Sequence, residues 1–100
     1  MKKILITRKL LKESEDNASK IFDVKLNKND NLLTTDELIL KSNDCDGILS
    51  SLTEKIDANV IKKLSKKVKI ISNFAVGFGN IDLEAAKKRG IAVTNTPEVL

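Results

Sequence analysis

The chain alternates short runs of apolar, β-branched residues with longer segments in which apolar residues recur at helical spacing. Short apolar runs of this kind are typical of strands, and the helical spacing is typical of amphipathic helices. The pattern therefore predicts five strands, at 4–7, 23–26, 47–50, 68–72 and 91–94, and four helices, at 10–22, 36–41, 57–64 and 82–90.

The expected helices carry recognisable end signals. Thr34 with Glu37 three residues later predicts a capping box, in which each residue satisfies a backbone N–H of the other. Asp57 and Asp82 are each placed to cap the start of a helix, and Gly90 is placed to end the last one.

Strands that alternate with helices predict a parallel sheet wound by right-handed crossovers. Residues 23–26 alternate polar and apolar side chains, which favours a half-wet edge strand, whereas 68–72 is nearly all apolar and is expected to be buried on both faces. The resulting prediction is an α/β fold, a flavodoxin-like three-layer sandwich with five parallel strands in the order 2-1-3-4-5. The helix at 10–22 is expected to turn one apolar face to this sheet, formed by Leu11, Ala18, Ile21 and Phe22.

Composition limits the chain to one small domain, because 100 residues leave no room for a second. The charge of +4 comes from 18 basic and 14 acidic residues that are interspersed. This favours an ordinary solvated surface over a nucleic-acid interface, which would require clustered basic residues and aromatic platforms.

Cys45 is the single cysteine and the chain has no histidine. No disulfide can form within the chain, and a zinc site or an activated thiol is not expected. No apolar stretch approaches the roughly 20 residues that cross a bilayer. We therefore expect a soluble, cytoplasmic protein without a metal site.

Ligands of open α/β sheets bind beyond the carboxyl ends of the strands, so the loops there are the candidate sites. The loop at 7–10 lacks the small residues that wrap a flavin phosphate, which argues against a flavodoxin. A phosphoacceptor receiver would need acids after the first and third strands and a lysine after the fifth. The chain instead has Arg8 and Lys9, Ser50 and Ser51, and Asn95.

Gly77-Phe78-Gly79 follows the fourth expected strand, but the third glycine of a Gly-x-Gly-x-x-Gly dinucleotide motif would fall on Asp82. A cofactor pyrophosphate is therefore not expected here. Either glycine can equally serve a tight turn through positive φ or close packing. Together with the loop at 51–53, which would lie beside it, the turn can form a carboxylate-sized pocket.

The segment 72–97, SNFAVGFGNIDLEAAKKRGIAVTNTP, resembles the D-isomer-specific 2-hydroxyacid dehydrogenases, in particular their glyoxylate and hydroxypyruvate reductase branch. The resemblance extends from about Asp46 to Leu100 and continues weakly to the N-terminus. Similar sequences often read Gly-x-Asp-Asn-Ile-Asp where this chain has Gly79 in place of the first Asp.

The resemblance implies that residues 1–100 are a partial substrate domain. Backbone amides at Val76 and Gly77 would bind the substrate carboxylate, and the loop with Leu52 would close over it. The family's dinucleotide-binding domain, arginine and acid-held histidine would follow Leu100. The chain would thus bind no cofactor and hold no catalytic residue, with NAD or NADP implied for the full-length enzyme.

Three interpretations remain open. The first is an N-terminal substrate-domain fragment that is inactive alone, and the second is a free-standing flavodoxin-like module that binds small carboxylates or another protein. The third is a pseudo-receiver that binds a partner through its surface. In the resembling family a C-terminal segment completes this domain, so we expect exposed apolar surface and self-association. The preferred 2-oxo acid and the choice between NADH and NADPH stay open.

Overall fold

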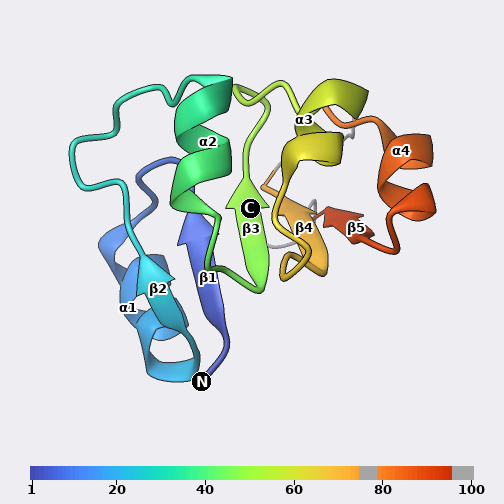
Figure 1. Cartoon of the computed structure of the whole chain (residues 1–100). Coiled ribbons are helices and arrows are strands. Elements are labelled where there is room, and N and C mark those ends of the chain that lie inside the picture. The colour runs from blue at the N-terminus through green and yellow to red at the C-terminus, as the bar shows by residue number, and fades with distance from the viewer. Residues whose placement is uncertain (75–78, 96–100) are drawn as a thin grey trace.

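A computed structural model describes residues 1–74 and 79–95 (Figure 1). These residues form strands and helices in strict alternation: β1 (Lys3–Ile6), α1 (Lys12–Ile21), β2 (Asp23–Lys25), α2 (Thr35–Lys41), β3 (Gly47–Ser50), α3 (Ala58–Lys63), β4 (Ile70–Asn73), α4 (Leu83–Lys88) and β5 (Ala92–Asn95). All strand pairs are parallel, and the sheet order is β2-β1-β3-β4-β5. The predicted fold class, strand order and edge position of the second strand are confirmed.

The N-terminal ends of the helices follow the sequence prediction. Thr34 Oγ1 accepts from the Glu37 amide at 3.1 Å, and Glu37 Oε1 accepts from the Thr34 amide at 3.0 Å, which completes the capping box. Asp57 and Asp82 each accept an amide three residues on, at 3.0 Å. These side chains replace the hydrogen-bond partners that the first turn of a helix lacks.

Gly90 ends α4 with a left-handed backbone, at φ 72°. The Gly90 amide donates to Lys87 O at 3.0 Å, and the Ile91 amide donates to Ala86 O at 2.9 Å. This pair of bonds is the Schellman arrangement, and it turns the chain directly into β5.

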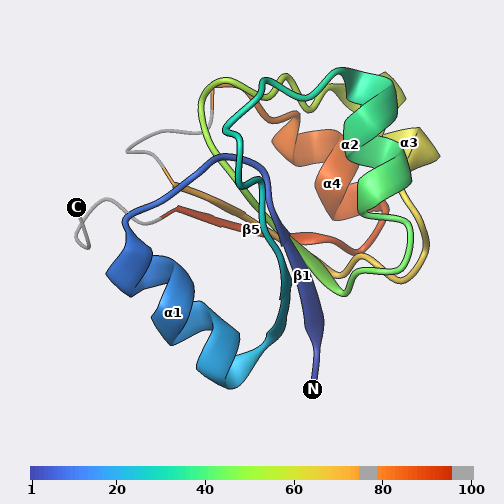
Figure 2. The ribbon, with the colours of Figure 1, turned by 90° about the vertical axis from the view of Figure 1, so that its left-hand side faces the viewer.

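The helices are distributed unequally over the sheet (Figure 2). α2, α3 and α4 lie on one face, and the main core lies between them and the strands, built from residues such as Leu38, Ile61, Ile71 and Ala86. Of the described helices, only α1 lies on the opposite face. The main hydrophobic core therefore lies on one face of the sheet only.

The expected apolar face of α1 is only partly correct. Ala18 and Phe22 are half-buried, but Leu11 is 79% exposed and Ile21 is 65% exposed. No residue of α1 is buried. Helical spacing predicted the helix, but this isolated helix covers too little of the sheet to bury all four side chains.

The prediction that residues 68–72 are buried on both faces is wrong. Ile71 is fully buried under the helices, whereas Ile70, which points to the other face, is 39% exposed. On that face no helix of residues 1–74 and 79–95 covers β4 and β5. An apolar groove remains there, lined by side chains that include Ile4, Phe22 and Leu49.

No helix within the described residues is long and apolar enough to cross a membrane.

Candidate functional site

Three chain segments lie together at the edge of the sheet where the carboxyl ends of β1, β3 and β4 meet. They are the loop at 7–10, the loop at 51–54 and the segment that follows β4, of which Phe74 and the residues from Gly79 onward are described. We call residues 51–54 the Leu52 loop. This edge is where the sequence placed the candidate site.

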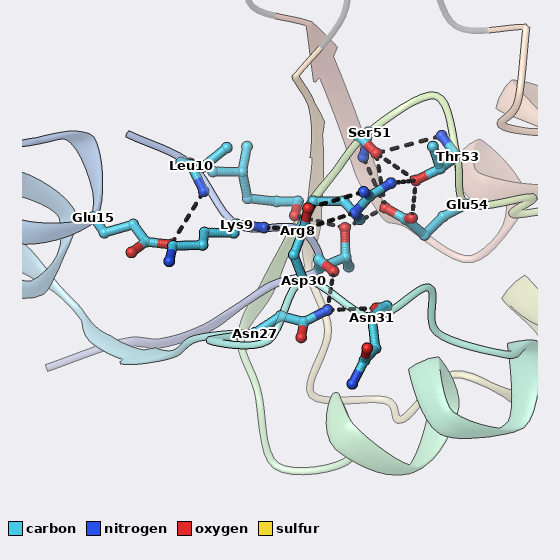
Figure 3. A network of polar contacts seen from close by, with 12 residues as sticks. Arg8, Lys9, Leu10, Glu15, Asn27, Asp30, Asn31, Ser51, Thr53 and Glu54 are labelled. Carbon is cyan, nitrogen blue, oxygen red and sulfur yellow. Dashed lines mark hydrogen bonds and ion pairs between the residues drawn. The ribbon is translucent and has the colours of Figure 1, made fainter. Parts of the chain in front are cut away.

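Glu54 anchors the Leu52 loop from inside (Figure 3). Its side chain is 3% exposed, and it accepts from the Ser51 amide at 2.9 Å and the Ser51 hydroxyl at 3.2 Å. The hydroxyls of Thr7 and Thr53 also donate to the Glu54 carboxylate. A buried carboxylate needs such donors to offset the loss of water, so Glu54 ties the loop to the end of β1.

Arg8 secures the outer side of the same loop. Its guanidinium binds Asp30 through Nε to Oδ1 at 2.8 Å and through a terminal nitrogen to Oδ2 at 3.1 Å, and it donates to Thr53 Oγ1 at 3.2 Å. Arg8, followed by the Lys9 amide at 2.8 Å, lowers the pKa of Asp30 to about 2. Arg8 therefore links the segment after β2 to the Leu52 loop.

Leu52, the first predicted substrate-binding residue, lies between these anchored neighbours. Its side chain is 63% exposed although it is apolar. Ser51 and Thr53 on either side are held by Glu54, so the loop presents Leu52 outward from a fixed backbone. Such an exposed leucine on an anchored loop is suited to contacting a ligand or a second domain.

Val76 and Gly77, the other two predicted substrate-binding residues, lie outside the described residues. The chain is described again from Gly79, and Asn80 directly contacts the Leu52 loop. Asn80 Nδ2 donates to the carbonyl oxygens of Ser51 and Glu54, each at 2.8 Å. The expected proximity of the segments after β3 and β4 is thus present at Asn80.

A second connection runs along the backbone just beyond the Leu52 loop. The Ile56 amide donates to Asn80 O at 2.7 Å, and the Asp82 amide donates to Ile56 O at 2.9 Å. Ile56 and Ile81 form an isolated parallel bridge, and both side chains are buried. These contacts fix the start of α4 relative to the start of α3.

Gly79 has no structural requirement for glycine. A Cβ built on it meets no atom of residues 1–74 and 79–95 within 4 Å, and no left-handed φ is recorded at this position. The described part of the chain therefore supports neither positive φ nor close packing at Gly79. The aspartate that similar sequences carry here fits the same backbone.

An open cleft of about 780 Å³ lies at the same edge on the side of α1. Its lining includes Arg8, Lys9, Ser14, Ser51 and Phe74. Two cationic side chains border it, but Arg8 is already paired with Asp30. The cleft is a competing place for anions to bind, and an anion titration distinguishes it from the Leu52 loop.

A separate cluster of groups with perturbed pKa values lies at the opposite end of the sheet. Lys25 and Lys3 hold the pKa of Asp44 well below its usual range. Burial raises the pKa of the neighbouring Cys45 thiol, which has no exposed surface. This cluster stabilises the amino ends of the strands, far from the Leu52 loop.

The sequence model of the D-isomer specific 2-hydroxyacid dehydrogenase family, catalytic domain, matches residues 4–100. Glyoxylate reductase of Thermococcus onnurineus is 38% identical over 98 residues, which are 98% of this chain and 29% of the relative. Glycerate dehydrogenase of Hyphomicrobium methylovorum is 40% identical over 96 residues, which are 96% of this chain and 30% of the relative.

Solved structures agree with the sequence relatives. A Polaromonas protein described as a D-isomer specific 2-hydroxyacid dehydrogenase superposes with a TM-score of 0.93 at 32% identity, covering 100% of this chain and 31% of that chain. D-lactate dehydrogenase of Escherichia coli superposes with a TM-score of 0.78 at 29% identity, covering 97% of this chain and 31% of that one.

The parallel sheet ordered β2-β1-β3-β4-β5, with loops gathered at the carboxyl ends of its strands, defines a doubly wound α/β domain. The match over residues 4–100 shows that the chain belongs to the D-isomer specific 2-hydroxyacid dehydrogenase family. It corresponds to part of the catalytic domain and spans about 30% of the length of the curated relatives it matches.

Sequence reasoning missed Glu54 and Asn80. Glu54 has the sequence context of an ordinary surface acid, and only its burial reveals its role. Asn80 follows Gly79, and asparagine beside glycine is common in turns, so the sequence alone indicates only a turn former here. A signal was nevertheless present, since a polar Ser-Leu-Thr-Glu segment after a buried strand requires partners for its hydroxyls and carboxylate.

Proposed function

We propose that residues 1–100 form the substrate-binding part of an NAD- or NADP-dependent 2-hydroxyacid dehydrogenase. The full enzyme would reduce a 2-oxo acid such as glyoxylate or hydroxypyruvate by hydride transfer. The observation that carries this proposal is the Leu52 loop, which Glu54 and Asn80 hold at the carboxyl edge of the sheet. Relatives named glyoxylate reductase and glycerate dehydrogenase support the substrate class.

In the proposed role, the backbone amides of Val76 and Gly77 bind the substrate carboxylate. Amide groups suit this task because they carry partial positive charge and do not titrate. Leu52 then covers the bound acid with an apolar side chain. Excluding water in this way strengthens the hydrogen bonds to the carboxylate.

The described residues do not fit a dinucleotide cofactor. Asp82 occupies the place of the third glycine of the dinucleotide motif, and its carboxylate caps α4 by accepting from the Ala85 amide at 3.0 Å. A carboxylate at that helix end would repel a pyrophosphate. We therefore assign no cofactor-binding and no catalytic residue to this segment. The nicotinamide, the proton donor and the substrate-orienting arginine belong to the remainder of the full enzyme.

The proposal is tested by NMR titration of the 100-residue polypeptide with oxalate and glyoxylate. We expect amide shifts at residues 74–80 and 50–53, with an affinity of about 1 mM or weaker, since each neutral hydrogen bond contributes only about 0.5–1.5 kcal/mol. Gly77→Pro, which removes one amide donor, is expected to abolish the response while the fold is retained.

Shifts confined to Arg8, Lys9 and Ser14 would place the anion in the neighbouring cleft and contradict the proposal. The polypeptide is also expected to show no turnover of glyoxylate or hydroxypyruvate with either nicotinamide cofactor. Measurable turnover by the pure polypeptide would refute the division of roles between this segment and the rest of the enzyme.

A second candidate function is a free-standing flavodoxin-like module that binds small carboxylates or another protein. The presence of a five-stranded sheet and a continuous core within the described part of the chain favours it. The two candidates differ in the residues that the gene encodes after Leu100. A Gly-x-Gly-x-x-Gly motif about 50 residues further on supports the dehydrogenase, and a stop codon supports the module.

We further propose that the polypeptide self-associates through the open face of the sheet. An apolar groove of about 430 Å³ lies beside α1, and Ile70 within it is 39% exposed. Uncovered apolar surface of this kind favours association. Light scattering across a wide concentration range is expected to show a rising average mass, and a constant monomer mass would contradict this proposal.

We also propose that the protein is located in the cytoplasm. This location is supported by the single cysteine, Cys45, which is buried as a free thiol. Thiols of this kind persist in reducing compartments. Fractionation of cells that express the protein tests this location, and recovery from an oxidising compartment would contradict it.

A further inference from the structure

We infer that Asn80 is a positioning residue that holds the Leu52 loop against the carboxyl end of β4. The inference rests on the proposed function, in which this loop closes over the substrate. It gives a role to a residue whose sequence context indicated only a turn.

Asn80 contacts both ends of the loop with one side-chain nitrogen. Nδ2 donates to the carbonyl oxygen of Ser51 at 2.8 Å and to that of Glu54 at 2.8 Å. Its Oδ1 accepts from Asn73 Nδ2 at 2.9 Å, and Asn73 is fully buried in β4. One amide therefore ties the first and last residues of the loop to a rigid strand.

The orientation of the Asn80 amide is set by its surroundings. Asn73 Nδ2 donates to Asn80 Oδ1 at 2.9 Å, and Asn73 Oδ1 accepts from the Ser50 hydroxyl at 3.0 Å and, over a longer 3.4 Å, from Asn80 Nδ2. Carbonyl oxygens accept only from donors, so the two carbonyl groups of the loop require the Asn80 Nδ2 group to face them. Among short side chains, only asparagine offers two such donors together with an acceptor.

Asn80 and Glu54 secure different parts of the loop. The Glu54 carboxylate holds the amide and hydroxyl of Ser51 and the hydroxyl of Thr53. Asn80 holds the carbonyl groups of Ser51 and Glu54, which a carboxylate cannot do because carbonyl oxygens need donors. Leu52 lies between these contacts. Asn80 thus acts on the ligand only through the loop.

The first test is amide hydrogen exchange in the polypeptide without ligand. The variants are Asn80→Ala and Asn80→Asp, which keeps the shape and the acceptor but removes both donors, with Asn17→Ala on the exposed side of α1 as the control. We expect the Ser51, Thr53 and Glu54 amides to exchange at least about tenfold faster in both Asn80 variants. Strand amides and the Asn17 variant are expected to be unchanged.

The second test is the oxalate titration repeated on the same variants. Since Asn80 acts on the loop and not on the carboxylate donors, we expect the response at 50–53 to be lost while the response at Phe74 and Gly79 persists. A merely structural role would reduce both responses together and raise exchange throughout the sheet, which would overturn the inference.

Unchanged exchange at the Leu52 loop in both variants would also overturn it, as would loss of the folded state in both. If only Asn80→Ala fails to fold, Asn80→Asp carries the test. If the original polypeptide does not respond to oxalate but both variants show faster loop exchange, the proposed function fails and the positioning role stands.

Discussion

Arg8 and Asp30 are joined by two hydrogen bonds across a separation of 22 residues, with Nε to Oδ1 at 2.8 Å and the second contact to Oδ2 at 3.1 Å. This pairing connects the loop after β1 to the segment between β2 and α2. Because Arg8 also reaches Thr53, it joins both to the Leu52 loop.

The charge state of Asp30 provides the first prediction. Arg8 lowers the pKa of the folded Asp30 to about 2, below the ordinary value of 3.8, so the pairing stabilises the fold above about pH 4. This contribution is lost as the pH falls toward 2, where the carboxylate takes up a proton. Carboxyl carbon NMR of Asp30 is expected to give a midpoint near 2. In Arg8→Gln the midpoint is expected to rise, and an unchanged midpoint would show that Arg8 is not the cause.

The second prediction concerns Glu54. Glu54→Ala removes the acceptor of the Ser51 amide and leaves the buried Thr7 hydroxyl only its longer contact with Leu49 O at 3.4 Å, so we expect the free energy of unfolding to fall by about 1–3 kcal/mol. Glu84→Ala is the matched control, because that side chain is 80% exposed. We expect the control to change stability by less than about 0.5 kcal/mol. Equal effects of the two substitutions in urea unfolding would contradict the buried role of Glu54.

The third prediction is that Gly79→Asp preserves the fold. No atom of the described residues lies within 4 Å of a Cβ built on Gly79, and no left-handed φ is recorded there. Thermal unfolding is expected to shift by less than the equivalent of about 0.5 kcal/mol. A large loss of stability would mean that the turn depends on glycine after all.

The fourth prediction is that the same substitution, Gly→Ala, has opposite consequences at two positions. Gly90 adopts φ 72°, so Gly90→Ala is expected to cost about 1–2 kcal/mol, although there is space for the methyl group. Gly79→Ala is expected to be neutral or slightly stabilising, because it restricts the unfolded chain without strain in the folded one. Chemical unfolding of the two variants side by side measures the difference, and similar values would refute the conformational argument.

Local features of the sequence determined the secondary structure. The capping box of Thr34 and Glu37, the caps at Asp57 and Asp82 and the stop at Gly90 are all confirmed, because each depends on residues only a few positions apart. The alternation of strands and helices then limited the sheet to parallel orders, and the half-wet strand at Asp23–Lys25 selected the edge.

Only the tertiary structure decided which apolar side chains are covered. Ile70 and Ile71 are identical in sequence character, yet Ile71 is fully buried and Ile70 is 39% exposed. Periodicity encodes which side chains share a face, but it does not encode how many helices pack on that face. Ile71 belongs to the core cluster that includes residues of α2, α3 and α4. Of the described helices, only α1 lies on the opposite face of the sheet.

The candidate site was likewise predicted only in part from the sequence. The sequence by itself placed Leu52 and the turn after β4 at one edge, because parallel strands align their carboxyl ends. The role of Glu54 depends on its hydrogen bond with Thr7, which lies 47 residues away in sequence. The role of Asn80 depends on its hydrogen bond to the Glu54 carbonyl oxygen, 26 residues away. Hydrogen bonds over such sequence separations form only in the packed fold. There, a buried polar group that lacks a partner costs free energy, so these groups pair with one another.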